Sequence, residues 1–165
     1  IIYSIAVSLR DLGMTMAPQN AFQTLLGLET LSLRMKKHVS NSIKIATWLE
    51  KHPKIEKVTY AGLKSSQYFN TAKSILPKGA GALFTISLKD GYEACMKMIS
   101  KLNLFSHVSN LGDTRSLIIH PASTVHRQLT EEQQKNAGLA PNVIRLSIGI
   151  EDPKDLINDL RNALE

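Results

Sequence analysis

The sequence predicts an α/β fold, a two-layer sandwich in which helices cover one small, mainly antiparallel sheet that follows a long helix. Two observations predict it. Short apolar segments alternate with helical segments through residues 53–165, in the order β, α, β, α, β, β, α, β, α. One helical pattern precedes them, from Pro18 to about residue 52. With 165 residues, 43% of them hydrophobic, the chain can bury a core without disulfides or metal.

The first fifty residues are expected to be helical. Residues 1–16 predict a short apolar helix that ends near Gly13, and Pro18 suits the first turn of the next. Apolar residues then recur at spacings of three and four, at Leu31, Met35, Val39, Ile43, Ala46 and Leu49. A helix of about 34 residues would be roughly 50 Å long, more than a small domain covers. We therefore expect its first half and the apolar opening segment to face a partner surface.

Residues 53–165 predict five strands and four helices. Alternation of apolar and polar residues marks the second strand as half-buried, and Asp152 and Pro153 suit the start of the last helix. The expected strands are 55–60, 82–88, 104–108, 116–119 and 143–150, and the expected helices are 67–76, 92–102, 130–136 and the segment from 153.

Composition excludes several classes of protein. The net charge of +6 comes from scattered lysines, with Lys36 and Lys37 the only adjacent pair, so nucleic-acid binding is not expected. No apolar run approaches the roughly twenty residues of a membrane span. A single cysteine, Cys95, fits a reducing, cytoplasmic location, and we expect it to be a packed hydrophobe rather than a nucleophile. Because Ile1 stands where a methionine would begin a gene product, we expect a processed chain or a fragment.

The last expected strand carries the first candidate site residue. Ile144, Leu146 and Ile148 lie on one face, expected against helices, while Arg145 lies on the other face beside small residues. A guanidinium donates two parallel hydrogen bonds to a carboxylate and stays charged at physiological pH. From the strand pattern alone, a solvent-facing arginine remains the alternative.

The polar segment 109–126 carries the second candidate site residue, Asn110. Asn110 offers an amide donor, Gly112 permits close backbone approach and Asp113 can start a turn. Three histidines, His107, His120 and His126, lack cysteine or acidic neighbours at ligand spacing, so no metal site is expected. The glycines at 79 and 81 do not have the spacing of a phosphate-binding loop.

Longer motifs in these segments resemble a known enzyme family. They are Asn110-Leu111-Gly112-Asp113-x-x-Ser116-Leu117-x-x-His120-Pro121-Ala122-Ser123-x-x-His126, Ile144-Arg145-Leu146-Ser147-Ile148-Gly149-Ile150-Glu151-Asp152 and, upstream, Gly27-Leu28-Glu29-Thr30-Leu31. The motifs are similar to the C-terminal part of the Cys/Met-metabolism family of pyridoxal-phosphate (PLP) enzymes, in particular its O-acetylhomoserine sulfhydrylase subgroup. The resemblance extends over essentially the whole chain.

The resemblance implies the C-terminal domain of a fold-type I PLP enzyme and a small amino-acid substrate. By it, Arg145 binds the substrate α-carboxylate, and Asn110 adds a hydrogen bond to the same group. Relatives such as methionine γ-lyase carry serine at the position of Asn110, which favours the sulfhydrylase subgroup. The subgroup converts O-acetyl-L-homoserine and sulfide to L-homocysteine and acetate, in methionine biosynthesis. Cystathionine γ-synthase and the γ-lyases remain alternatives, as does a non-catalytic amino-acid-binding or interaction module.

The resemblance also implies that part of the enzyme lies outside this sequence. The family's Schiff-base lysine stands in a Ser-x-Thr-Lys motif that this sequence lacks. We therefore expect no catalytic, cofactor-binding or metal-binding residue in this chain, and no activity from the chain alone. Residues 1–17 would be the tail of the cofactor-binding domain, 18–52 a connecting helix and 53–165 the substrate-side domain. The complete enzyme would bind PLP and form a homo-oligomer, a tetramer in this family.

Overall fold

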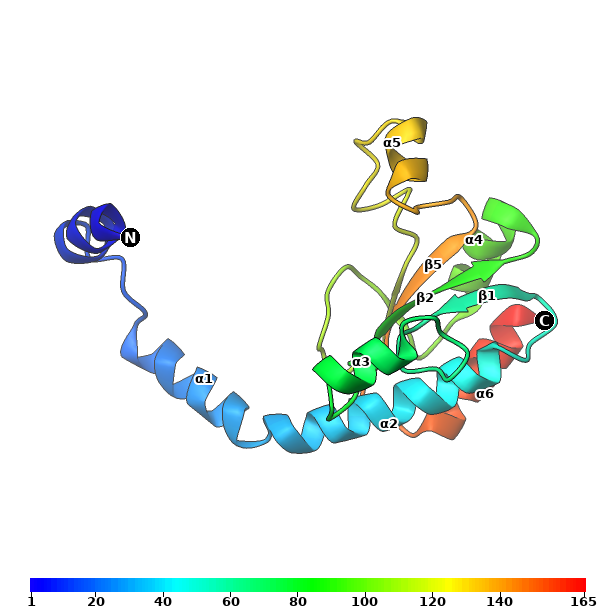
Figure 1. Cartoon of the computed structure of the whole chain (residues 1–165), viewed down its shortest axis with the longest axis horizontal. Coiled ribbons are helices and arrows are strands. Elements are labelled where there is room, and N and C mark those ends of the chain that lie inside the picture. The colour runs from blue at the N-terminus through cyan, green and yellow to red at the C-terminus, as the bar shows by residue number, and fades with distance from the viewer. The chain divides into compact units, whose positions relative to one another are not determined.

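The structure, a computed structural model, describes residues 1–165 except the side chains of Glu131 and Lys135. Its contacts divide the chain into two compact units, residues 1–33 and 34–165. The first unit contains a π-helix, η1 (Ser4–Asp11), and helix α1 (Pro18–Glu29) (Figure 1). Neither helix has a buried residue, and large apolar side chains such as Phe22 and Leu25 are exposed. The apolar residues of this unit are therefore not covered within it.

The prediction of one continuous helix over residues 18–52 is wrong, because the structure has two helices there. Helix α1 ends at Glu29, and helix α2 (Leu31–Leu49) begins after a break at Thr30, whose φ and ψ are −100° and 0°. The apolar repeat continues across this break, so periodicity alone could not reveal it. The later part of α2 contributes core residues, among them Ile45, Ala46 and Leu49, to the second unit.

The second unit is built on one five-stranded sheet. Its strands are β1 (Ile55–Thr59), β2 (Leu83–Leu88), β3 (Ser106–His107), β4 (Leu117–Ile119) and β5 (Val143–Ser147), in the spatial order β1-β2-β5-β4-β3. Only the pair β3–β4 is parallel. The predicted mainly antiparallel sheet is therefore confirmed, and its last strand in sequence, β5, lies in the centre.

Helices cover one face of this sheet (Figure 1). Alternate strand residues, including Phe84, Ile86, Ile144 and Leu146, join one apolar core with residues of α2, α4 (Gly91–Lys101) and α6 (Pro153–Leu164). Two shorter helices, α3 (Phe69–Ile75) and α5 (Glu131–Asn136), complete the unit. As predicted, Asp152 caps α6, with its carboxylate 2.8 Å from the backbone nitrogen of Lys154.

Two expectations from composition can be compared with the structure. Cys95 lies in α4 and is completely buried in the core, which confirms that it packs as a hydrophobe. Among the residues described, no helix has both the length and the apolar character needed to cross a membrane.

Candidate functional site

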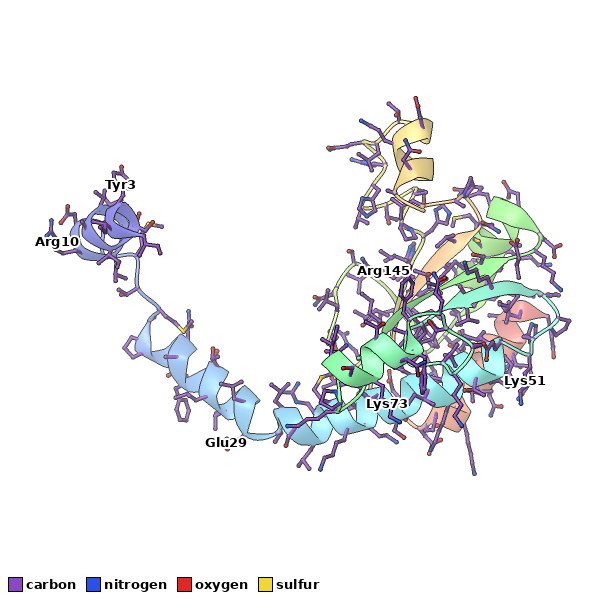
Figure 2. The ribbon with its side chains drawn as sticks, in the orientation of Figure 1. Tyr3, Arg10, Glu29, Lys51, Lys73 and Arg145 are labelled. Atoms are coloured by element: carbon purple, nitrogen blue, oxygen red, sulfur yellow. The ribbon has the colours of Figure 1, made fainter. Side chains whose placement is uncertain are left out.

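Arg145 lies in the middle of the sheet, on the face opposite the helices (Figure 2). Its register partners are Thr85 on β2 and Ile119 on β4. The side chain is half-buried, and its Nη2 lies 3.4 Å from the hydroxyl of Ser109, the residue before Asn110. Among the described side chains, Arg145 forms an ion pair with no carboxylate, so its charge is free for an anionic ligand.

The rest of this face is less open than the sequence predicts. Val143 and Ser147 are buried, and the backbone of Thr114 and Arg115 lies directly against Gly149. The contact of this loop with Gly149 joins segments distant in sequence, so alternation along β5 could not predict it. Arg145 is the one partly exposed residue of β5.

Asn110 belongs to the loop that joins β3 to β4. Its Oδ1 accepts a hydrogen bond from the backbone N–H of Leu111 at 2.8 Å, which leaves the side-chain NH2 group as the donor available to a ligand. The structure brings the loop to Arg145 through Ser109. It does not record a direct contact between Asn110 and Arg145.

The same loop contains an ion pair. The carboxylate of Asp113 lies 3.3 Å from Nη2 of Arg115 and accepts a hydrogen bond from the Arg115 backbone N–H at 2.9 Å. The backbone hydrogen bond, followed by the side-chain bond from Arg115, lowers the pKa of Asp113. The hydrogen bond to Asp113 raises the pKa of Arg115. The turn predicted at Asp113 is thus fixed by its own side chain.

Ser116 and Glu151 connect this loop to the residues after β5. The carboxylate of Glu151 accepts hydrogen bonds from the Ser116 backbone N–H at 2.6 Å and from its hydroxyl at 2.9 Å. The hydroxyl oxygen in turn accepts from the backbone N–H of Gly149 at 2.9 Å. The sequence predicts no role for Ser116 or Glu151, because a local pattern cannot reveal a contact between residues 35 positions apart.

Helix α2 supports the same turn from the other side. Nδ1 of His38 lies 2.6 Å from the carbonyl oxygen of Ile148, and Nδ2 of Asn41 donates to the carbonyl oxygens of Gly149 and Glu151. Both side chains are buried. The turn after β5 is therefore held by side chains from the loop on one side and from α2 on the other.

His120 has a structural role. Its Nε2 lies 2.8 Å from the carbonyl oxygen of Pro141, and its Nδ1 lies 2.8 Å from the hydroxyl of Ser123, so both ring nitrogens have partners. The ring also contacts Tyr92 edge to face, with centroids 5.1 Å apart. Within the described residues, no three His, Cys, Asp or Glu side chains form a cluster suited to a metal ion.

The glycine turn at residues 79–81 does not fit a cofactor phosphate. Methyl groups of Val39 occupy the space beside Gly79, and the carbonyl oxygen of Gly81 accepts a hydrogen bond from the Tyr60 hydroxyl at 2.7 Å. A phosphate cradle needs free backbone N–H groups, and the N–H of Gly79 already donates to the carbonyl oxygen of Leu76 at 2.9 Å.

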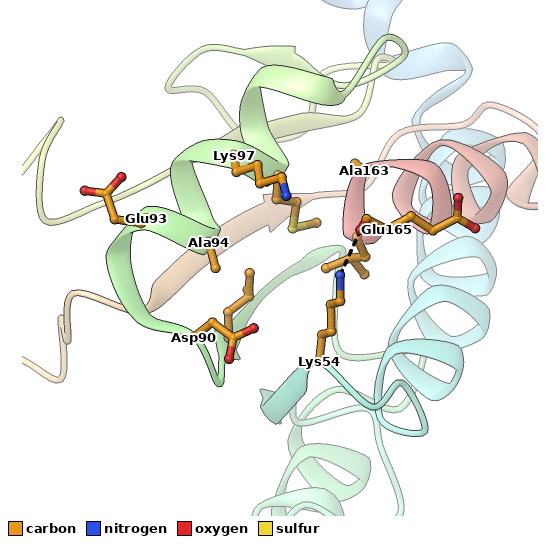
Figure 3. Close-up of a pocket in the computed structure, with 10 residues that line it drawn as sticks. Lys54, Asp90, Glu93, Ala94, Lys97, Ala163 and Glu165 are labelled. Carbon is orange, nitrogen blue, oxygen red and sulfur yellow. Dashed lines mark hydrogen bonds between the residues drawn. The ribbon is translucent and has the colours of Figure 1, made fainter.

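Two cavities of the second unit lie away from Arg145. One, of about 390 Å³, is drawn in Figure 3, where Lys54 donates to the backbone oxygen of Glu165 at 3.0 Å beside Asp90, Glu93 and Lys97. A second, of about 590 Å³, is lined mainly by apolar atoms of Tyr92, His120, Ala122, Ser123, Gln134, Leu139, Ala140 and Pro141. Neither includes Arg145 or Asn110, so neither is the predicted carboxylate site.

Comparison with known proteins gives a consistent result. Residues 2–165 match the sequence profile of the family described as Cys/Met metabolism PLP-dependent enzyme. The chain is 48% identical to the O-acetyl-L-homoserine sulfhydrylase of Leptospira meyeri, over 95% of this chain and 36% of that protein. It is 46% identical to O-acetyl-L-homoserine sulfhydrylase 1 of Thermus thermophilus, over 94% of this chain and 37% of that protein.

A solved structure is also similar throughout the chain. It is that of a Campylobacter jejuni protein assigned as an O-acetylhomoserine (thiol)-lyase, which carries a pyridoxyl-lysine monophosphate. The TM-score is 0.91 and the identity 46%, over 99% of this chain and 39% of that one. The present chain thus spans well under half the length of the proteins it matches.

Proposed function

The chain belongs to the family of Cys/Met metabolism PLP-dependent enzymes, and we propose that it is the substrate-side, C-terminal part of an O-acetyl-L-homoserine sulfhydrylase. The complete enzyme replaces the acetate of O-acetyl-L-homoserine with sulfide and releases L-homocysteine. In this proposal Arg145 binds the α-carboxylate of the amino acid, and the NH2 group of Asn110 donates a further hydrogen bond to it.

The observation that carries this proposal is the guanidinium of Arg145, which forms an ion pair with none of the described carboxylates. It stands on the central strand, where neighbours on both sides restrict its position, and its hydrogen-bond partner is the neutral hydroxyl of Ser109. A half-buried guanidinium loses part of its hydration, and a bound carboxylate would compensate for that loss. A carboxylate held by Arg145 would be fixed in orientation, as alignment of the reacting carbon requires.

The cofactor and its lysine belong, in this proposal, to the part of the fold that the chain does not span. When bound, PLP supplies the electron sink for chemistry at the carbon that carries the amino group. Residues 1–17 would then be the end of the cofactor domain, 18–52 the connection and 53–165 the substrate-side domain. The exposed apolar side chains of η1 and α1, such as Leu9 and Phe22, would pack on that domain or on other subunits of a homo-oligomer, a tetramer in this proposal.

The test is substitution of Arg145 in the complete enzyme. Arg145→Ala should raise KM for O-acetyl-L-homoserine by on the order of a hundredfold, because it removes a charged bidentate contact. Arg145→Lys should recover part of the loss. Arg161→Ala, at an exposed arginine of α6, is the matched control and should leave KM unchanged. A normal KM in the Arg145→Ala enzyme would refute the assignment.

A comparison of acceptors tests the reaction class. The wild-type enzyme should form L-homocysteine from sulfide faster than it forms cystathionine from cysteine, or an oxo acid without any acceptor. The 165-residue chain alone should show no turnover. If cysteine were the better acceptor, or the elimination faster, another activity of the same family would replace the proposed one.

A further inference from the structure

Strand β5, which carries Arg145, pairs over only three residues with β4, the strand that follows the loop with Asn110. Strand β4 pairs with β5 from Ile119 opposite Arg145 to Leu117 opposite Ser147, and there the ladder ends. The loop with Asn110 lies beyond that end. Past that end, the spacing between the loop and β5 depends on contacts outside the β4–β5 ladder.

A cluster of side-chain and backbone hydrogen bonds continues the pairing past this point. The first residue beyond the ladder is Ser116, whose backbone N–H and hydroxyl both bind the carboxylate of Glu151, at 2.6 and 2.9 Å. The hydroxyl oxygen of Ser116 also accepts from Gly149, and the backbone N–H of Ile150 donates to Thr114 at 2.9 Å. Ser116 is completely buried. Hydrogen bonds to a carboxylate are stronger than neutral ones, so Glu151 is the strongest single link in this cluster.

We propose that Glu151 and Ser116 are positioning residues for the substrate carboxylate. This inference rests on the proposed function, in which Arg145 and Asn110 hold one carboxylate from two separate segments. By binding the loop to the end of β5, Glu151 keeps Asn110 and Ser109 at the correct distance from the guanidinium. Neither Glu151 nor Ser116 needs to touch the substrate, because each acts through the loop.

The test compares Glu151→Ala and Glu151→Gln in the complete enzyme. Glu151→Ala leaves the buried donors of Ser116 without an acceptor, so KM for the amino-acid substrate should rise on the order of tenfold. KM for sulfide should not change. Glu151→Gln retains an oxygen that accepts from the Ser116 backbone N–H and should recover much of the loss. If Glu151→Ala does not fold, Glu151→Gln and Ser116→Ala carry the same test, each with a smaller increase.

Inhibition distinguishes carboxylate positioning from general damage. L-Norvaline carries an α-carboxylate, whereas butylamine is the same molecule without it. Glu151→Ala should weaken inhibition by norvaline about tenfold and leave inhibition by butylamine unchanged. Equal weakening of both inhibitors, or of neither, would overturn the proposal.

Asp159 provides a matched control. Its buried carboxylate also accepts backbone hydrogen bonds, from Asn103 at 3.0 Å and Leu104 at 2.9 Å, but it links α6 to the segment after α4. Asp159→Ala should lower the melting temperature as Glu151→Ala does, without the change in KM or in norvaline inhibition. A similar rise in KM in both variants would make the role of Glu151 merely structural.

Arg145→Ala, measured in parallel, separates this inference from the proposed function. If Arg145→Ala raises KM and Glu151→Ala does not, the positioning role is wrong and the carboxylate site stands. If Arg145→Ala has no effect, the carboxylate site itself is wrong, and with it the inference.

Discussion

The side-chain amide of Asn41 lies 2.8 Å from the backbone carbonyl oxygen of Glu151 and 3.1 Å from that of Gly149. Asn41 stands on α2 and is completely buried. One side chain therefore satisfies two carbonyl groups of the turn that follows β5. Because the carboxylate of Glu151 also binds the loop with Asn110, α2 supports the candidate site indirectly, through the turn after β5.

Substituting Asn41 should destabilise the second unit. Asn41→Ala leaves two carbonyl oxygens of the turn without their donor, and we expect the free energy of unfolding to fall by about 2 kcal/mol. Urea unfolding of the 165-residue chain, followed by the fluorescence of its single tryptophan, Trp48, measures this. Asn158→Ala, at an exposed position of α6, should change it by less than about 0.5 kcal/mol. Equal losses in the two variants would contradict the role of Asn41.

The phenol of Tyr60 should ionise only above its ordinary pKa. Burial raises the pKa of Tyr60 from 10.0 to about 12, and its hydroxyl donates to Gly81 at 2.7 Å. Folding therefore favours the protonated phenol, so this contribution to stability is complete below pH 10 and is lost as the pH rises toward 12. Absorbance at 295 nm should show a late step, the ionisation of one tyrosine near pH 12 or only on unfolding.

Tyr60→Phe identifies that tyrosine. The variant should lack the late step and should lose about 1 kcal/mol of stability at neutral pH, where the hydrogen bond to Gly81 is intact in the wild type. Tyr68→Phe, at an exposed position, should keep the late step. A late step that persists in Tyr60→Phe would assign it to another residue.

Much of the second unit could be predicted from the sequence because local pattern determines it. The alternation in residues 83–88 gave a strand with Phe84, Ile86 and Leu88 buried, and Asp152 with Pro153 marked the start of α6. The strand at 143–150 was predicted three residues too long. Its last residues leave the ladder to make the turn held by Asn41 and Glu151, and this depends on contacts distant in sequence.

The candidate site was predictable only in part. Arg145 and the loop with Asn110 could be named from residue type and motif, and the structure links them through Ser109. The contact of Glu151 with Ser116 joins two segments whose separate sequences do not specify their pairing. The break at Thr30 was missed because a repeat of three and four residues remains in phase across one non-helical residue.

Cys95 should react with thiol reagents only after unfolding. It is buried, and burial raises the pKa of its thiol from 9.0 to about 11. At pH 8 the thiolate fraction in the folded protein is therefore about a hundredfold lower than in the unfolded chain, before access is considered. Labelling with a chromogenic disulfide should be slow in buffer and fast in urea. Rapid stoichiometric labelling of the folded chain would contradict the burial of Cys95.

Gly149→Ala should separate the loop from β5. A Cβ at this position would lie 2.6 Å from the carbonyl carbon of Arg115 and closer still to the carbonyl oxygen of Thr114, so the backbone must move. We expect a loss of about 2 kcal/mol in stability, typical of overpacking.

Gly27→Ala is the matched control for this prediction, since nothing lies within 4 Å of a Cβ there and alanine favours the helix. It should leave the stability equal or higher. Because Gly149 donates to the Ser116 hydroxyl, displacement of the loop should also raise KM for the amino-acid substrate in the complete enzyme. Normal stability in Gly149→Ala would mean that the loop can move away from Gly149 at no cost. If KM were normal as well, the contact between the loop and the end of β5 would not set the geometry around Arg145.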